Sequence, residues 1–324
     1  FSIWDLESVN HYKDQTDIFF TCHEFSYNKI AEAYEPYLGL IRQMFHKYCS
    51  GTLEEFMEEC DVYKLQRPVF ESYFEKGFCE RTEQILIDEV EYEQERMRNS
   101  IVTMLQKLSE IRPVVIVLNR FQLASKSTMQ LSNSLLQVKN KNIGIVLGVN
   151  DVQSIPEFAH EEWDAICESM DDRNMVYHIG NAGRNMEPDV MDYYSDYESD
   201  DGYRKLNNLV YFLDFDQANH HLSKIERRIK FDNFTISEKK HYQLLLLQIM
   251  VSVLQRDIAK ALESCEDLEK LQDQEKEGAF YYNFWMATSY MYLGKLEEAM
   301  IYVQKAKECG EALGDDFLVF RAEL

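Results

Sequence analysis

The order of apolar and polar residues divides the chain into two parts of different character. In the first part, short apolar runs alternate with segments whose apolar residues recur at helical spacing. The clearest run, 114–118, follows Pro113, contains four β-branched residues and ends abruptly in polar residues. Runs of this kind are typical of strands buried inside a parallel sheet. We therefore predict that 114–118 is a central strand whose carboxyl end faces a ligand site.

Other short apolar runs predict further strands, and apolar residues at helical spacing predict helices between them. Strands alternating with helices indicate parallel β-α-β units, so residues 1–185 are predicted to form one α/β domain with a parallel sheet. The remaining predicted strands lie at 17–22, 143–149 and 175–179, and the predicted helices lie at 36–45, 51–76, 82–111 and 127–138.

Residues 186–204 differ in kind, because carboxylates are interleaved with tyrosines. Calcium-binding loops also concentrate carboxylates, but this segment lacks the residue order of an EF-hand loop. We therefore interpret it as a solvated acidic linker between two domains.

The last part of the chain, 205–324, is predicted to be all-helical and repetitive. Three helix pairs can be aligned on a small residue near the start of each second helix, at Ala218, Ala261 and Ala299. The intervals of 43 and 38 residues lie in the range of long helical-hairpin repeats. The sequence therefore predicts that a stack of helical hairpins follows the α/β domain in the chain.

The last hairpin carries the clearest repeat pattern. Tyr290, Gly294 and Ala299 alternate large and small side chains, as hairpins that pack on one another require. Tyr281 and Trp285 are at helical spacing and are expected to lie mainly in the repeat core. Their alternative role is to line a concave groove that binds a peptide or partner domain.

The amino-acid composition argues against several classes of binding partner. The chain has 324 residues with 57 acidic and 34 basic side chains, a net charge of −23. Phosphate backbones attract clustered Lys and Arg, so direct nucleic-acid binding is not expected. Seven scattered cysteines without C-x-x-C spacing fit reduced thiols in the cytoplasm. We find no apolar run of about 18 residues and no signal-peptide pattern, so no membrane association is expected.

Taken together, the order of these features resembles the STAND group of signalling P-loop NTPases, relatives of the AAA+ family, followed by tetratricopeptide-like repeats. Similar arrangements occur in the bacterial maltose regulator and large LuxR-type regulators. The resembling segments are 19–22 with 36–40 (second strand and Pro-Tyr segment), 112–136 (Walker B strand and helix), 143–150 (sensor strand) and 280–313 (repeat).

Two departures from the family bear on activity. No G-x-x-x-x-G-K-[ST] phosphate loop occurs in the chain, and the resemblance would place that loop at or before Phe1. The Walker B strand ends in Asn119 and Arg120 where the family has acidic residues, and an Asn side chain cannot act as a general base. Asn150 falls at the family's sensor position, with a strand-terminal turn as its alternative role.

No catalytic or metal-ligating set stands out in the sequence. Cys22 and His23 are adjacent on a predicted strand, so their side chains should point to opposite sides and not form a nucleophile pair. His220 and His221 are adjacent on a predicted helix and diverge by about 100°, which argues against shared metal coordination. The nucleotide-site remnant is therefore limited to Asn119, Arg120 and Asn150.

We expect a fragment of a signal-transduction or transcription-regulatory protein that acts as a switch or scaffold. Its helical repeats would bind a protein or peptide partner, without a cofactor and without hydrolysis by this chain alone. One alternative is a STAND NTPase that binds or hydrolyses ATP with Mg²⁺, with its phosphate loop upstream of Phe1. The other alternative is a pure repeat scaffold.

Overall fold

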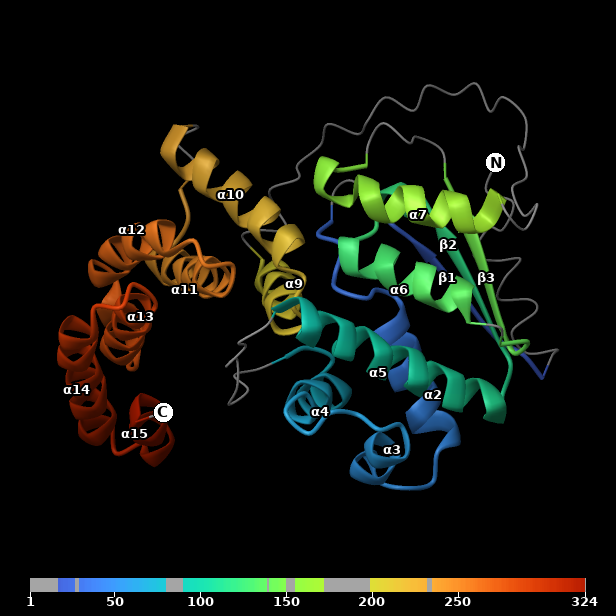
Figure 1. Cartoon of the computed structure of the whole chain (residues 1–324), viewed down its shortest axis with the longest axis horizontal. Helices are drawn as coiled ribbons and strands as arrows, with labels where there is room; N and C mark the ends of the chain where they lie inside the picture. Colours follow the sequence, from blue (N-terminus) through green and yellow to red (C-terminus); the bar gives the residue numbers. More distant parts are fainter. Residues whose placement is uncertain are drawn as a thin grey trace. The chain divides into compact units, whose positions relative to one another are not determined.

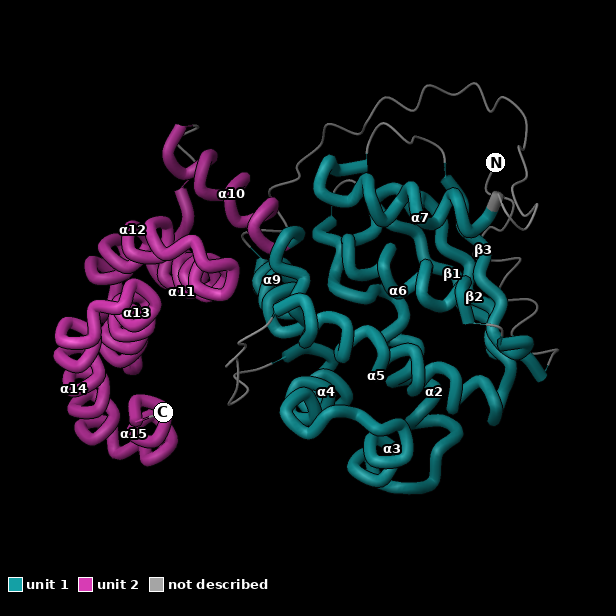
Figure 2. Tube along the Cα trace, viewed as in Figure 1, with its two compact units in different colours: residues 1–217 teal, residues 218–324 magenta. Residues whose placement is uncertain are grey.

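The computed structural model describes residues 17–26, 29–79, 90–138, 140–149, 155–171, 199–231 and 235–323. These residues are mostly helical, with one small parallel sheet, and the chain divides into two compact units, 1–217 and 218–324 (Figure 2). No helix within the described ranges is long and apolar enough to span a bilayer.

The sheet of the first unit has three strands in the order β1-β2-β3, all parallel: β1 (Phe19–Glu24), β2 (Val114–Asn119) and β3 (Ile143–Gly148). The prediction that 114–118 is a central strand is therefore confirmed. Four of its five apolar side chains are almost completely buried, and Val115 is half-buried, as expected for a strand in the middle of a sheet. The predicted strand at 175–179 lies outside the described residues.

Helices surround this sheet in the first unit (Figure 1). Most predicted helices are confirmed, and each buries the apolar face of its amphipathic pattern inside the unit. The described part of the predicted 82–111 helix begins at residue 90. The helical elements are α2 (Tyr37–Tyr48), α3 (Leu53–Glu59), α4 (Arg67–Lys76), α5 (Val90–Ile111), η1 (Phe121–Leu123), α6 (Lys126–Gln137), η3 (Glu157–Ala159) and α7 (His160–Asp171).

The first unit also contains α9 (Asp200–Tyr211), which places the boundary between units at 217/218 instead of 204/205. Asn208 Oδ1 accepts a hydrogen bond of 2.8 Å from the backbone N–H of Cys79, and Asn207 Nδ2 donates one of 2.6 Å to its carbonyl. These bonds hold α9 to the first unit. Residues 200–204 are therefore helical, although the sequence had suggested a linker that extended to 204.

The second unit is entirely helical within its described residues. Its helices α11 and α12 form one hairpin, and α13 and α14 form another. Ala218, Ala261 and Ala299, the residues used to align the predicted hairpins, are all buried. The helical elements are α10 (Phe215–Phe231), which begins before the boundary, α11 (Glu238–Leu254), α12 (Ile258–Glu269), η4 (Gln272–Gln274), α13 (Gly278–Tyr292), α14 (Leu296–Leu313) and α15 (Asp316–Glu323).

The turns between these helices share one geometry. Arg256, Gly294 and Gly314 each have a positive φ, of 64°, 71° and 67°. After each of them, a backbone N–H donates to the carbonyl five residues earlier, with lengths of 2.8 to 3.1 Å. This is the Schellman geometry, in which a left-handed residue ends a helix and satisfies its last carbonyls. The α11–α12, α13–α14 and α14–α15 connections are thus variants of one turn.

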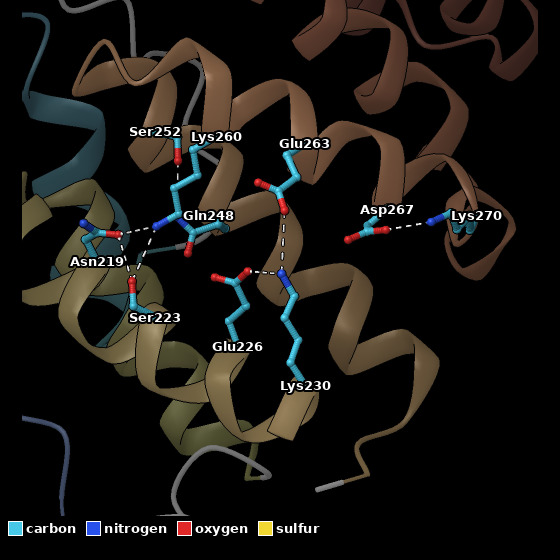
Figure 3. A network of polar contacts seen from close by, with 10 residues as sticks. All are labelled: Asn219, Ser223, Glu226, Lys230, Gln248, Ser252, Lys260, Glu263, Asp267 and Lys270. Carbon is cyan, nitrogen blue, oxygen red and sulfur yellow. Dashed lines mark hydrogen bonds and ion pairs between the residues drawn. The ribbon is translucent and has the colours of Figure 1, made fainter. Parts of the chain in front are cut away.

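Polar contacts join α10 to α12 (Figure 3). Lys260 Nζ donates to Asn219 Oδ1 at 2.9 Å and to Ser223 Oγ at 3.5 Å. Farther along the same helices, Lys230 Nζ lies 2.7 Å from Glu226 Oε1 and 3.7 Å from Glu263 Oε1. The Lys230 ion pairs are exposed and contribute little to stability, so the partly buried Lys260 contacts are the more specific link.

Candidate functional site

The carboxyl end of the sheet brings two of the predicted site residues together. In the register of the sheet, Glu24, Asn119 and Gly148 are aligned. Arg120 has a left-handed backbone (φ 54°), and its Nε lies 3.2 Å from Glu24 Oε1. Asn119 Nδ2 donates to Cys22 Sγ at 3.7 Å. The predicted remnant residues are therefore engaged with neighbouring side chains.

Asn119 also constrains the neighbouring strand. A Cβ added at Gly148 would lie 3.1 Å from Asn119 Oδ1, so the Asn119 amide would have to shift by a few tenths of an ångström to admit it. The third predicted site residue, Asn150, lies outside the described residues.

A pocket of about 270 Å³ lies beside the last residues of β1. Its wall includes β1, the loop that follows it, the first two turns of α2, and α4. Its polar lining residues include Thr21, Cys22, His23, Glu32, Glu35 and Tyr73. We call it the acidic pocket, because Glu32 and Glu35 are its two carboxyl groups. Titratable groups gathered in one cavity are typical of binding or catalytic sites.

Each of the two carboxyl groups of the acidic pocket accepts a hydrogen bond. The backbone N–H of Glu32 donates to Glu35 Oε2 at 3.2 Å. Asn208 Nδ2 donates to Glu32 Oε2 at 2.8 Å. His23 Nε2 lies 3.6 Å from Glu35 Oε1. Through Asn208, the pocket is thus connected directly to α9.

Burial shifts all three titratable groups toward their neutral forms. Burial, together with repulsion from Glu35, raises the pKa of Glu32 from 4.5 to about 7. Burial likewise raises the pKa of Glu35. Burial lowers the pKa of His23 to about 4, with help from the nearby Lys29. Near pH 7 the imidazole is therefore neutral and Glu32 is partly protonated, so the pocket can take up or release a proton.

The loop that carries Glu32 and Glu35 is fixed by the start of α6. Ser125 Oγ donates to the carbonyl of Glu32 at 2.9 Å, and Thr128 Oγ1 donates to that of Glu35 at 3.1 Å. Ser125 is also the N-cap of α6, as its side chain accepts from the N–H of Thr128. Hydroxyl groups at the start of α6 therefore also position the acidic loop.

A second buried carboxylate, Asp214, lies at the same end of α6. Its oxygens accept from the backbone N–H of Ser127 at 2.9 Å and of Gln217 at 3.4 Å. Burial raises the pKa of Asp214, and these bonds partly offset the effect. A carboxylate at a helix N-terminus is also stabilised by the helix dipole. Asp214 therefore has a structural role and links the α9–α10 connection to α6.

The sequence interpretation missed the acidic pocket. Its visible signal was a pair of carboxylates three residues apart within the otherwise apolar stretch 30–41. Cys22 and His23 both line the pocket, where Cys22 Sγ accepts a hydrogen bond from Asn119 and His23 lies beside Glu35. That the two side chains form no nucleophile pair stays a prediction.

The candidate residues of the helical unit are mainly packing residues. Tyr281, Trp285 and Ala299 are buried. Gly294 provides the positive φ of the α13–α14 turn, where an added Cβ would meet no atom within 4 Å. Tyr290 stacks on the ring of Tyr302, with centroids 5.6 Å apart. Tyr281 and Trp285 are buried, as expected of core residues. Their alternative role, lining a groove that binds a partner, stays a prediction.

Among the residues that the structure covers, no group of three or more His, Cys, Asp or Glu side chains is arranged to hold a metal ion. Comparisons with profiles of protein families, with curated proteins and with solved structures found no significant match. The function is therefore argued from the geometry of the two units.

Proposed function

We propose that this chain acts as a switch or scaffold in a signal-transduction or transcription-regulatory protein, and that its helical unit recognises a protein or peptide partner. The observation that carries this proposal is the helical unit, in which two hairpins, each closed by the same kind of turn, pack side by side. Arrays of this kind present extended surfaces to partner chains. In this proposal the hairpins are tetratricopeptide-like repeats.

Apolar side chains at the start of α14 mark the proposed partner surface. Leu296 and Met300, one turn apart, are 64% and 65% exposed, and Leu293 in the preceding turn is 46% exposed. Ile258 occupies the position in α12 that corresponds to Leu296, two residues after the positive-φ residue, but is buried. The same position is covered in one hairpin and uncovered in the next, which supports a surface that a partner covers.

The α/β unit contributes to this proposal as a switch or scaffold and not as a hydrolase. Phosphoryl transfer relies on an acidic residue that positions Mg²⁺, and Asn119 is uncharged. The acidic pocket offers a switch instead. Gain or loss of the Glu32 proton changes the strength of the hydrogen bond that Asn208 of α9 donates to the Glu32 carboxyl group.

Nucleotide binding is the second candidate, favoured by the parallel sheet with β2 at its centre. Thermal unfolding with and without Mg²⁺-ATP tests it. A ligand at 100 times its Kd would add about 2.7 kcal/mol of stability. An unchanged midpoint at millimolar ATP would count against this candidate.

Selection of binders from a displayed peptide library, with the full chain as bait, tests partner recognition. Selected peptides should lose binding to the variants Leu296→Glu and Met300→Glu, because a charge replaces an exposed apolar contact. Leu65→Glu is the matched control, since Leu65 is an exposed leucine of the other unit. Peptides that bind equally well to all three variants would contradict the proposed surface.

A further inference from the structure

We propose that a basic hollow at the amino end of β1 binds a small molecule that bears phosphate groups. The hollow has a volume of about 640 Å³, within the range of small-molecule sites, roughly 300–1,000 Å³. It is formed by the start of β1, the second half of α2 and the residue Arg112 just before β2. This inference is independent of the proposed function, because it concerns a different part of the α/β unit.

Every charged side chain in the described lining of the hollow is basic. Arg42, Lys47 and Arg112 line it together with His46, and none of the described residues that line it is Asp or Glu. The whole chain carries a net charge of −23, so such a concentration of cations is unusual within it. Clustered Lys and Arg side chains are the groups that bind phosphate oxygens.

The guanidinium group of Arg42 is held in place. Its Nε donates to the carbonyl of Phe74 at 2.6 Å, and its Nη2 donates to that of Glu75 at 3.0 Å. These acceptors are uncharged carbonyl groups, so the positive charge of Arg42 is not neutralised by them. A pre-positioned cation loses less conformational entropy when a ligand binds.

The aromatic rings of Tyr48 and Phe19 form one wall of the hollow, and the cationic groups of Lys47 and Arg112 lie near the Tyr48 ring. Lys47 Nζ and the guanidinium carbon of Arg112 each lie 5.4 Å from the centre of the Tyr48 ring. The ring of Phe19 meets that of Tyr48 edge-on, with centroids 6.2 Å apart. Cations placed from separate elements around one hollow suit a ligand with at least two negative charges, such as a diphosphate, better than a single carboxylate.

Helix capping explains part of this arrangement. Basic residues at the end of α2 are favourable for its dipole, and Arg42 and His46 contact carbonyls at the end of α4. Capping does not explain Arg112, which comes from another element, or the lack of acidic lining residues. The hollow also lies at the end of β1 opposite to Asn119, so it is separate from the predicted nucleotide-site remnant.

Calorimetric titration of the full chain with inorganic pyrophosphate tests the proposal. Lys47→Gln and Arg112→Gln should each weaken binding by about tenfold, because each removes a charge-assisted contact. Lys64→Gln, an exposed lysine elsewhere, and Arg120→Gln, at the opposite end of the sheet, should leave the affinity unchanged. Lys47 is exposed, so Lys47→Gln tests the site even if Arg112→Gln does not fold.

Three results would overturn the proposal. The first is no binding of pyrophosphate at low ionic strength. The second is an affinity that Lys47→Gln leaves unchanged or that Arg120→Gln lowers equally. The third concerns the class of ligand: citrate, a tricarboxylate, should bind at least tenfold more weakly than pyrophosphate, and equal binding would mean that the hollow does not select phosphate.

Discussion

The two ends of β1 and α2 carry ionisable groups of opposite kind, acidic at one end and basic at the other. At the carboxyl end of β1, the acidic pocket holds Glu32 and Glu35 just before the first turn of α2. At the amino end of β1, the basic hollow holds Lys47 in the last turn of α2 and Arg112 beside it. Acids near a helix N-terminus and bases near its C-terminus are both favourable for the helix dipole. One short helix therefore favours both charge clusters.

Burial is what makes the two ends chemically different. Glu32 and Glu35 are partly enclosed, so they shift toward their neutral forms and the pocket responds to protons. Lys47 is exposed, and its side chain lies in the hollow with Arg42 and Arg112, so the hollow attracts anions. The resemblance to nucleotide hydrolases predicts a phosphate site at the carboxyl end of the sheet. The cluster of basic side chains that could bind phosphate lies at the amino end.

The largest expected effect comes from removing the charge of Glu32. Because its folded pKa of about 7 exceeds the ordinary 4.5, Glu32 adds stability that is complete below pH 4.5 and lost as the pH rises through 7. Glu32→Gln, which mimics the protonated form, should be more stable than the native chain at pH 8 by about 3 kcal/mol. This difference should vanish near pH 4.5. Denaturant unfolding between pH 4.5 and 8 measures it.

Glu54→Gln is the control for this series, because it changes an exposed carboxylate on α3. Its difference from the native chain should not vary with pH by more than about 0.5 kcal/mol. If Glu32→Gln shows the same difference at every pH, Glu32 is not the proton-responsive group.

A smaller effect is expected from the residue that positions the acidic loop. Ser125→Ala removes the N-cap of α6 and the hydrogen bond to the Glu32 carbonyl, so it should cost about 1–2 kcal/mol. Ser134→Ala, in the body of the same helix, should be close to neutral, since alanine is a better helix former. Thermal unfolding of both variants provides the comparison, and equal losses would argue against the role given to Ser125.

The smallest effect concerns the ion pair at the carboxyl end. Glu24→Gln leaves Arg120 without that carboxylate, but the pair is partly exposed, so the loss should be below about 0.5 kcal/mol. Pyrophosphate affinity should stay unchanged, because the anion site lies at the other end of β1. A tighter complex in Glu24→Gln would place the anion beside Arg120 and break the contrast between the two ends.

Local patterns predicted much of the fold. The apolar run at 114–118 is contiguous in sequence, and its strand was found where expected. The boundary between units was placed too early because α9 looks like the first helix of a hairpin. Contacts with residues over a hundred positions away attach it to the α/β unit, among them the bonds of Asn207 and Asn208 to Cys79 and of Asn208 to Glu32.

Neither cluster at the ends of β1 could be predicted in the same way. Arg112 comes near Tyr48 because α5 returns the chain to the start of β2, beside the start of β1. The raised pKa of Glu32 depends on its burial in the folded chain and on the neighbouring Glu35, and no local sequence pattern reports that burial. The spacing of apolar residues predicts helices and strands, whereas the charge clusters form only when these helices and strands pack together.

The most direct test of the contrast between the two ends is a crystal of the protein soaked in tungstate, a heavy-atom mimic of phosphate. The anomalous difference map should show a peak in the basic hollow, within contact of Lys47 and Arg112. A map with no peak in that hollow, or with its strongest peak beside Asn119 and Arg120, would contradict the account.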